Sequence, residues 1–367
     1  MRAWAQSTVP HRRNAWRLRI LLVSVFRESV IGGVSVHSSN LRDRLRADGH
    51  DVHAVDFYGA LAPGRGVLAK AASLIGACAR VLSARLSGYR VVHFHTSNKA
   101  PLFYLTSLPL KLSGATLLLS VHSGLGYEPW LASHPLFAGL NRLFFPLLTR
   151  LIFMNEEEVA RIGRRYPSIA SRIAKVNPYI APSVGEELSR PAPATLPLRV
   201  VTVGAFIPRY ATEETLRACR RLTEEHGVPV HLTIVESSAY AQDAYRQKLT
   251  AEIDAARSPA LTIDLVVDTQ DILGTMAGHH AFVRPARGDS YGLCVAEALL
   301  LGIPSIATDV CTRCAAADLY APGDLDALVA WLLERSRDLR TAGRSLLAPD
   351  EDSYHGYLDI YEAVQPA

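Results

Sequence analysis

Short apolar runs alternate with longer segments of helical spacing along most of the chain. Ten of these runs are four to nine residues long and are bounded by turn residues, which is typical of buried strands. We predict strands at Leu18–Phe26, Val52–Asp56, Val91–His95, Leu117–His122, Leu151–Met154, Arg199–Gly204, His231–Glu236, Leu261–Val267, Ala281–Pro285 and Ser305–Thr308. Helical spacing covers Val34–Ala47 and, as an amphipathic helix, Leu68–Leu86. Strands and helices in alternation predict an α/β fold built on parallel sheets.

A Pro-rich segment divides this alternation into two units. Five prolines fall between Pro178 and Pro197, and the strand, turn and helix pattern restarts directly after them. We therefore predict two Rossmann-like domains that face each other across a cleft, which suits a chain of 367 residues. The expected boundaries are a loose tail at 1–17, a first domain at 18–180, a linker at 181–198 and a second domain at 199–367.

The most informative segment runs from Asp289 to Pro304. It starts with a carboxylate beside a small, Gly-containing turn, continues as an apolar helix with one acid, Glu297, and ends at Gly302. The eight positions that separate the two acids span about 12 Å of helix. Free N–H groups at a helix start suit a diphosphate, and carboxylates accept hydrogen bonds from sugar hydroxyls.

This segment resembles the donor-site signature of the family-4 retaining glycosyltransferases, whose fold, GT-B, consists of two facing Rossmann-like domains. The resemblance implies that Asp289 holds the transferred sugar during catalysis and that Glu297 holds the ribose. It also implies donor binding by the residues of the turn between them, which are Ser290, Tyr291, Gly292 and Leu293.

Two segments of the first half are also similar to this family. Gly32-Gly33 and the helix that follows resemble its opening loop, in which Gly33 lets backbone N–H groups come close to the donor phosphates. His122 stands at the end of a strand, where α/β proteins bind ligands. By the same resemblance, His122 is a catalytic residue near the transferred sugar, although packing in a loop is the alternative.

The chain departs from the family pattern where an Arg and a Lys normally hold the diphosphate. Ala205 stands in place of the Arg, and Tyr210 stands in place of the Lys. Stabilisation of the leaving group is the main electrostatic task in this chemistry. We predict that Arg209 or Arg287 takes over donor binding, because both fall on loops expected to face the donor; Arg284 is a further nearby cation.

Charge is distributed unevenly between the two halves of the chain. Residues 1–180 hold 23 Lys and Arg against 9 Asp and Glu, a balance of +14, whereas residues 181–367 hold 16 against 26, a balance of −10. A basic half suggests an anionic partner. We expect an anionic membrane surface, contacted by Leu68–Leu86 and Pro101–Leu112, and no nucleic acid, since no such motif is present. The alternative is that these helices pack in a core and that the charge serves only solubility. No run is long enough to span a membrane; the longest, Pro101–Val121, contains Pro109 and Lys111.

Two patterns raise the question of a metal. His93 and His95 point to one face of a strand, and Cys311 and Cys314 form a C-x-x-C pair. Neither pair has further ligands at metal-binding spacing, so we favour packing or acceptor-side polarity for the histidines and free thiols for the cysteines. The family resemblance likewise implies that no metal and no cofactor are needed.

The resemblance implies a retaining, metal-independent hexosyltransferase. It would move a sugar from a nucleotide-diphosphate sugar to the hydroxyl of a glycan or lipid-linked acceptor, as in bacterial polysaccharide biosynthesis. We expect it in the cytoplasm or peripherally on the cytoplasmic face of the membrane. Two alternatives stay open: a nucleotide-sugar epimerase of the same fold, and a non-catalytic nucleotide-sugar binding protein, which the missing Arg and Lys would favour.

Overall fold

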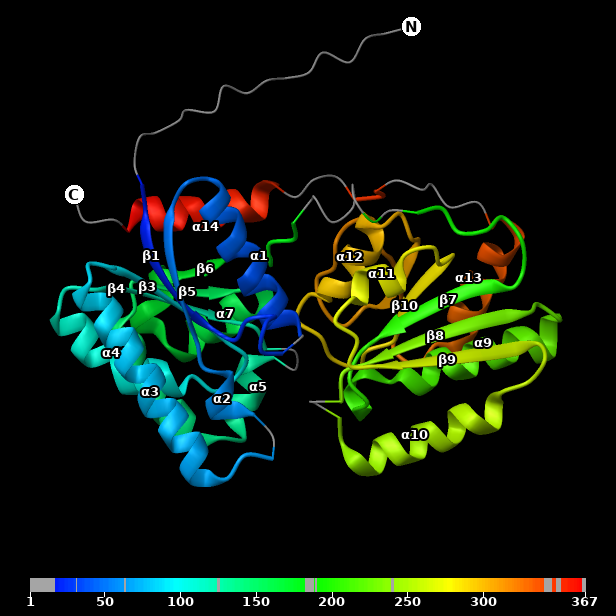
Figure 1. Cartoon of the computed structure of the whole chain (residues 1–367), viewed down its shortest axis with the longest axis horizontal. Coiled ribbons are helices and arrows are strands. Elements are labelled where there is room, and N and C mark those ends of the chain that lie inside the picture. The colour runs from blue at the N-terminus through cyan, green and yellow to red at the C-terminus, as the bar shows by residue number, and fades with distance from the viewer. Residues whose placement is uncertain are drawn as a thin grey trace, which may run out of the picture.

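The computed structural model contains two α/β units, one from each half of the chain (Figure 1). It describes residues 17–30, 32–62, 64–123, 126–181, 188, 190–238, 241–339, 345–347 and 351–364. The expected tail therefore lies outside the described residues except for Arg17, and so do residues 182–187 and 189 of the expected linker.

The first unit is a six-stranded parallel sheet in the order β2-β1-β3-β4-β5-β6. Along β1, Leu21 and Val23 pack into the core on one face, while Ile20 and Leu22 pack into the core on the other. A strand buried on both faces reads as a continuous apolar run. The strands are β1 (Arg19–Ser24), β2 (Asp51–Asp56), β3 (Val91–Thr96), β4 (Thr116–Val121), β5 (Arg150–Phe153) and β6 (Ile173–Lys175). The helices are α1 (Gly33–Ala47), α2 (Tyr58–Leu61), α3 (Val67–Leu86), α4 (Pro101–Leu112), α5 (Tyr127–Ala132), α6 (Pro135–Phe144) and α7 (Glu156–Arg165).

The second unit is another six-stranded parallel sheet, in the order β12-β11-β10-β7-β8-β9. Its central strand, β7, is again buried on both faces, because Val200 and Val201 belong to separate cores. The strands are β7 (Leu198–Val203), β8 (Val230–Glu236), β9 (Leu261–Val267), β10 (Ala281–Arg284), β11 (Ser305–Thr308) and β12 (Asp318–Tyr320). The helices are α9 (Thr212–His226), α10 (Asp243–Ala256), α11 (Ile272–Met276), α12 (Leu293–Leu300) and α13 (Leu325–Arg337).

The last helix, α14 (Glu351–Ala363), does not pack on the second unit, to which we had assigned it. Its three tyrosines, Tyr354, Tyr357 and Tyr361, are buried in a core of the first unit (Figure 1). The hydroxyl of Tyr361 lies 2.7 Å from Nδ1 of His93 on β3. The first unit therefore includes the C-terminal helix. The predicted second domain, 199–367, was wrong in this respect, because α14 belongs to the first unit.

All ten predicted strands are present to within two residues at each end. The two strands that we missed, β6 and β12, have three residues each and lie at the edges of their sheets. Such short edge strands carry too few apolar positions to form a recognisable pattern.

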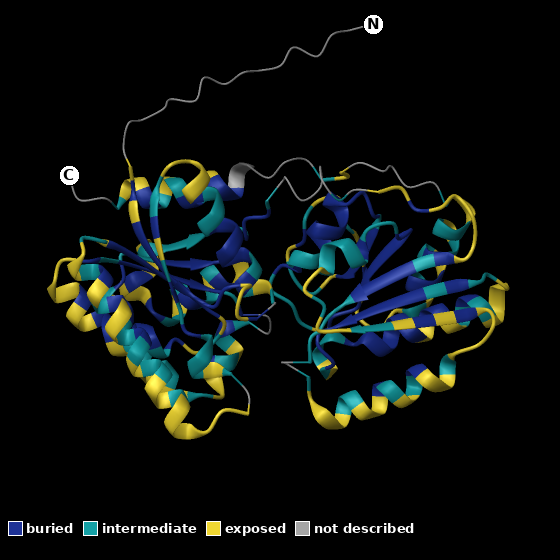
Figure 2. Ribbon diagram, in the orientation of Figure 1, coloured by how far each residue is buried: buried dark blue, intermediate teal, exposed yellow. Residues whose placement is uncertain are grey.

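Helix α3 is present as predicted. Its outer face is largely apolar and exposed, as the expected membrane contact requires (Figure 2). By length and composition alone, it is also the one described helix that could cross a membrane, contrary to the expectation that no run is long enough. However, Ala77, Val81 and Ala84 are buried in the core of the first unit, so α3 lies along the sheet.

Candidate active site

Each sheet reverses its strand order at one point. In the first sheet the chain moves outward in opposite directions from β1 and β3, and in the second sheet from β7 and β10. In open α/β sheets, ligands bind beyond the carboxyl ends of the strands at such a switch point. The residues that follow these four strands are therefore the first place to look for a site.

At the switch point of the second sheet, Asp289 forms a buried charge cluster with two arginines. Its Oδ2 accepts hydrogen bonds from Arg284 Nε at 3.0 Å and Arg313 Nη1 at 2.9 Å. All three side chains are nearly inaccessible to solvent. Burial opposes ionisation of Asp289, but the two guanidinium groups outweigh it and hold the pKa of this carboxyl well below its usual range. Two cations and one anion leave a net charge of +1 in the cluster.

Arg313 is the residue of this cluster that we did not predict. It follows β11, and it also donates to the carbonyl oxygen of Tyr291 at 3.1 Å. Its position between Cys311 and Cys314 carries no local signal of an ion pair, because its partner lies 24 residues earlier in the chain.

Glu297 lies inside α12. The residue is only 8% exposed, and no hydrogen bond or ion pair to its carboxyl group occurs among the described residues. Burial raises its pKa to about 7. A buried carboxyl group without a partner is costly unless a ligand supplies one. Glu297 lies on a helix as expected, but α12 begins only at Leu293, so the helix does not span the whole interval from Asp289 to Glu297. The free oxygens of Glu297 suit ligand hydroxyls.

Three of the predicted donor-binding residues, Ser290, Tyr291 and Gly292, lie in the turn before α12, and a fourth, Leu293, begins the helix. The backbone N–H of Ser290 donates to Asp289 Oδ1 at 3.1 Å, and the buried Tyr291 packs against Ile180 and α12. Gly292 has a φ of +77°, and a Cβ at this position would lie 2.1 Å from Arg313 Nη1. Glycine is therefore required twice, for the backbone conformation and for the approach of Arg313.

The two arginines proposed as diphosphate ligands differ in their surroundings. Arg287 Nη2 lies 2.7 Å from Glu213 and 3.3 Å from Glu214, so its charge is already balanced. Arg209 has its guanidinium carbon 5.1 Å from the centre of the Tyr210 ring, and its buried Nε has no hydrogen-bond acceptor. Arg284 lies over the same ring at 4.0 Å. Tyr210, which replaces the family's Lys, thus holds two cations by cation–π contact.

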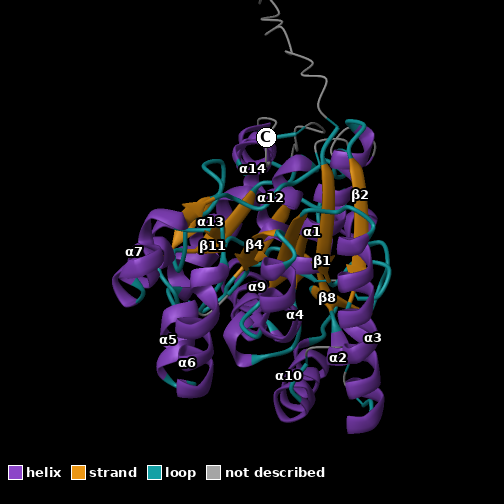
Figure 3. Ribbon diagram, turned by 90° about the vertical axis from the view of Figure 1, so that its left-hand side faces the viewer, coloured by secondary structure: helices purple, strands orange, loops and turns teal. Residues whose placement is uncertain are grey.

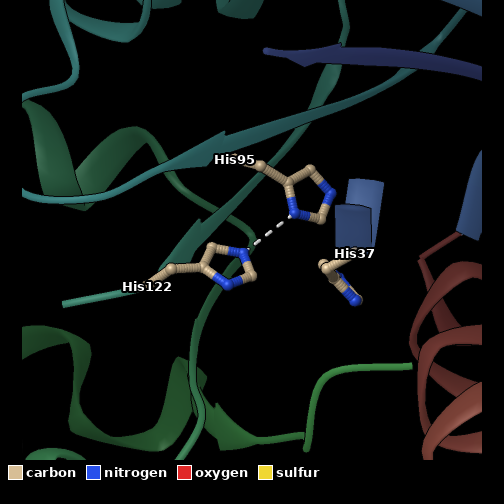
Figure 4. A group of neighbouring side chains, drawn as sticks. All are labelled: His37, His95 and His122. Carbon is tan, nitrogen blue, oxygen red and sulfur yellow. Dashed lines mark hydrogen bonds between the residues drawn. The ribbon is translucent and has the colours of Figure 1, made fainter. Parts of the chain in front are cut away.

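At the switch point of the first sheet, three histidines come together (Figure 4). They come from separate elements: His37 from α1, His95 from β3, and His122 from the residue after β4. His95 Nδ1 and His122 Nε2 lie 3.2 Å apart, and one ring nitrogen from each of the three residues lies within 4.8 Å of the others. Near them, Gly33 begins α1, and a Cβ there would meet nothing within 4 Å.

The hydrogen bonds of His37 define what this cluster offers to a ligand. The backbone N–H of Tyr179 donates to His37 Nδ1 at 2.9 Å, so the proton of the neutral ring is on Nε2. Among the described residues, this buried Nε2–H has no acceptor, and the buried Nε2 of His95 has no hydrogen-bond partner either. His37 therefore presents a donor rather than the lone pair that a metal requires. Burial lowers the pKa of His37 to about 4 and also lowers the pKa of His95 and His122.

His93 has a different role from its neighbour His95. Its two ring nitrogens are both satisfied, by Tyr361 at 2.7 Å and by Ser120 at 2.8 Å. The packing that we favoured for the histidine pair thus describes His93. His95, in contrast, joins His37 and His122 at the carboxyl end of the sheet.

One short segment connects the two clusters. Tyr179 supplies the N–H bonded to His37, and the next residue, Ile180, packs against Tyr291, Ala296 and Leu300 of the second unit. Because consecutive residues contact His37 and the α12 region, the histidines and the α12 turn belong to neighbouring parts of the molecule.

Comparisons with known proteins agree with this architecture. Residues 197–338 match the family model "Glycosyl transferases group 1". HepE of Anabaena, whose structure was solved with UDP and glucose, matches with a TM-score of 0.66 at 13% identity, covering 95% of this chain and 100% of HepE. The trehalose-6-phosphate synthase OtsA matches with a TM-score of 0.72 at 12% identity, covering 95% and 100% of the two chains. A glycosyltransferase of Rickettsia africae matches with a TM-score of 0.64 at 12% identity, covering 95% and 98%. A search of curated proteins by sequence found no match.

The fold is therefore GT-B, as predicted, over nearly the whole chain. The second unit matches the group 1 glycosyltransferase model over residues 197–338, which agrees with the family resemblance seen in the sequence.

Proposed function

We propose that this glycosyltransferase moves a hexosyl group from a nucleotide-diphosphate sugar to an acceptor hydroxyl, with retention of configuration and without a metal. The observation that carries the proposal is Glu297, a buried residue of α12 whose carboxyl group has no hydrogen-bond or ion-pair partner among the described residues. The carboxyl group would accept hydrogen bonds from the ribose hydroxyls. HepE is similar in fold and was also solved with UDP-glucose, which supports the same class of donor.

The remaining residues have the chemistry for the other parts of such a donor. The cationic group formed by Arg209, Arg284 and Arg313 would stabilise the charge that grows on the leaving diphosphate. Arg284 and Arg209 both contact Tyr210, the position of the missing Lys, so they bring charge to the place where the family has it. The Nε2–H donor of His37 and the neighbouring His122, together with the open space at Gly33, would receive the transferred sugar.

The acceptor belongs to the proposal as well. We infer a glycan or lipid-linked hydroxyl, supported by the basic first half of the chain, and a cytoplasmic location that includes the membrane surface. The loss of the Arg and Lys pair favours one rival, a protein that binds a sugar nucleotide without turning it over. Incubation with a panel of nucleotide sugars, with and without acceptor glycans, separates the two by mass spectrometry, because only the enzyme releases nucleotide diphosphate.

The role of Glu297 can be tested without knowing the sugar. The variant Glu297→Gln should bind a nucleoside diphosphate about 10- to 100-fold more weakly, since a hydrogen bond to a charged group contributes about 1.5–3 kcal/mol. Because the pKa of Glu297 is about 7, the affinity of the wild-type protein should also rise as the pH increases from 6 to 8. Isothermal titration calorimetry measures both effects.

Glu224→Gln, at an exposed position of α9, is the matched control and should leave affinity unchanged. Equal affinity of folded Glu297→Gln and wild-type protein would remove the ribose assignment. Asp289→Ala is a less useful variant, because it leaves two buried arginines without their shared partner.

A further inference from the structure

The outermost helices of the first unit expose large apolar side chains in rows. On α3, Leu68, Ile75 and Leu86 are 86%, 69% and 85% exposed. The spacing of these residues, with Ala72 and Ala79 between them, places all five on one side of the helix. This side is therefore a continuous apolar stripe, where a surface helix normally carries polar residues.

The neighbouring helices repeat this pattern. Leu105, Leu108 and Leu112 on α4, and Leu136 and Leu143 on α6, are each more than half exposed. Helix α4 contacts both α3 and α6, and Figure 3 shows the three together on the side of the first unit that faces away from the second. We refer to the exposed apolar residues of α3, α4 and α6 as the apolar helix face.

The second unit shows that this exposure is not a general property of the protein. Its outer helix α10 has no large exposed hydrophobic residue, and its exposed positions include Gln247, Lys248 and Asp254. An apolar face on three adjacent helices is larger than the scattered apolar residues of an ordinary surface, and such patches mark interaction sites.

The charge around the apolar helix face is positive. From Phe57 to Asn155 the chain has nine Lys and Arg residues, and Glu128 is its one acidic residue. None of α3, α4 and α6 contains an acid. Their cations are Lys70, Arg80, Arg85, Lys111 and Arg142, and no ion pair to an acid is formed by any of them among the described residues.

These features select one occupant. A second copy of this chain, packed face to face, would bring like charges together. A membrane-spanning arrangement of α3 would expose the core residues Ala77 and Val81 that hold the helix on the sheet. A bilayer with anionic headgroups complements both the leucines and the cations.

We propose that the apolar helix face docks the protein on an anionic phospholipid bilayer, with the leucines inserted among the acyl chains and the cations at the headgroups. This goes beyond electrostatic attraction, because the leucines provide an attachment that salt does not screen. It also goes beyond the proposed sugar transfer and does not depend on it.

Sedimentation of the full chain with lipid vesicles tests the proposal. The vesicles consist of phosphatidylcholine alone or of phosphatidylcholine partly replaced by phosphatidylglycerol. We expect binding to the anionic vesicles at least about tenfold tighter than to the neutral ones, weakened but not abolished by high salt. The double variant Ile75→Glu with Leu108→Glu should lose at least about tenfold in affinity, because acidic groups then meet the bilayer.

A double variant with the same charge change elsewhere is the control. Val267→Glu with Leu319→Glu replaces exposed apolar residues of the second unit and should bind vesicles like the wild-type protein. Circular dichroism establishes that all variants are folded. Equal sedimentation of the α3/α4 variant and the wild-type protein would overturn the proposal, as would equal binding to both kinds of vesicle. The proposal would also be overturned if the wild-type protein did not bind vesicles but formed a dimer in analytical ultracentrifugation, and if the α3/α4 variant were monomeric. The apolar helix face would then be a protein interface.

Discussion

At the scale of single residues, the unusual feature is how positive charge gathers around Tyr210 and Asp289 in the candidate site. Tyr210 replaces the Lys of the related family, but its ring holds Arg209 and Arg284 by cation–π contacts at 5.1 and 4.0 Å. Arg284 in turn shares Asp289 with Arg313. The chain thus lacks the two cations of the related family at positions 205 and 210. Three other arginines lie nearby, two of them on the Tyr210 ring and two of them paired with Asp289.

This arrangement predicts different roles for Arg209 and Arg287. Arg209→Gln should reduce turnover by about 10- to 100-fold with little change in nucleotide affinity, because charge on the leaving phosphate grows in the transition state. Arg287→Gln should change turnover little, since Glu213 and Glu214 already balance the charge of Arg287. Steady-state kinetics with the active donor compares the two. Full turnover in Arg209→Gln would place the diphosphate contact elsewhere.

At the scale of elements, the histidine cluster depends on three chain segments that end at the same edge of the sheet. The ends of β3 and β4 and the first turns of α1 bring His95, His122 and His37 together. Parallel strands always place their carboxyl ends at one edge, so residues distant in sequence meet there. The rings are buried in their neutral form, which makes the first unit sensitive to acid.

We expect the free energy of unfolding to fall as the pH decreases from about 6.5 towards 4. Burial lowers the pKa of His37 to about 4 and of His93 to about 3, whereas both residues titrate near 6.5 in the unfolded chain. Between these pKa values the unfolded state therefore binds more protons than the folded state. The contribution of the two histidines to the free energy of unfolding is complete above about pH 6.5 and is lost as the pH falls. Each histidine contributes a slope of up to about 1.4 kcal/mol per pH unit.

Urea unfolding at several pH values measures this slope. The variant His37→Asn keeps an acceptor for the N–H of Tyr179 but has no titratable group, so its slope should be smaller by about one proton. A slope identical to that of the wild-type protein would show that His37 is not buried as a neutral ring.

At the scale of the whole molecule, the two units are tied together by segments that leave one unit and pack on the other. Helix α14 follows the second unit in the sequence but completes a core of the first. Tyr179 and Ile180 follow the first unit, and Ile180 packs on α12 of the second. The two units are thus held together by α14, which packs on the first unit, and by Ile180, which packs on the second.

A substitution on α14 should therefore destabilise the first unit. Tyr361→Ala removes a fully buried ring and should lower the free energy of unfolding by about 3–5 kcal/mol, as for other large buried aromatic residues. Hydrogen exchange should speed up in β1, β3 and β4 before it does in β7 and β8. Tyr361→Phe keeps the ring and loses only the hydrogen bond to His93, so its effect should be near 1 kcal/mol. Faster exchange in the second unit alone would contradict the packing of α14.

The sequence by itself determined the features that depend on neighbouring residues. The buried strands were recognisable because a strand covered on both faces is apolar at every position, and the α12 turn because its acids and glycines stand at fixed spacing. The tertiary structure alone decided which residues meet across the fold. Arg313 reaches Asp289 over 24 residues, and His93 reaches Tyr361 over 268. The structure also decided that the predicted apolar stripe of α3 is exposed, because helical spacing shows that a helix has an apolar side but not whether that side faces a core or the solvent.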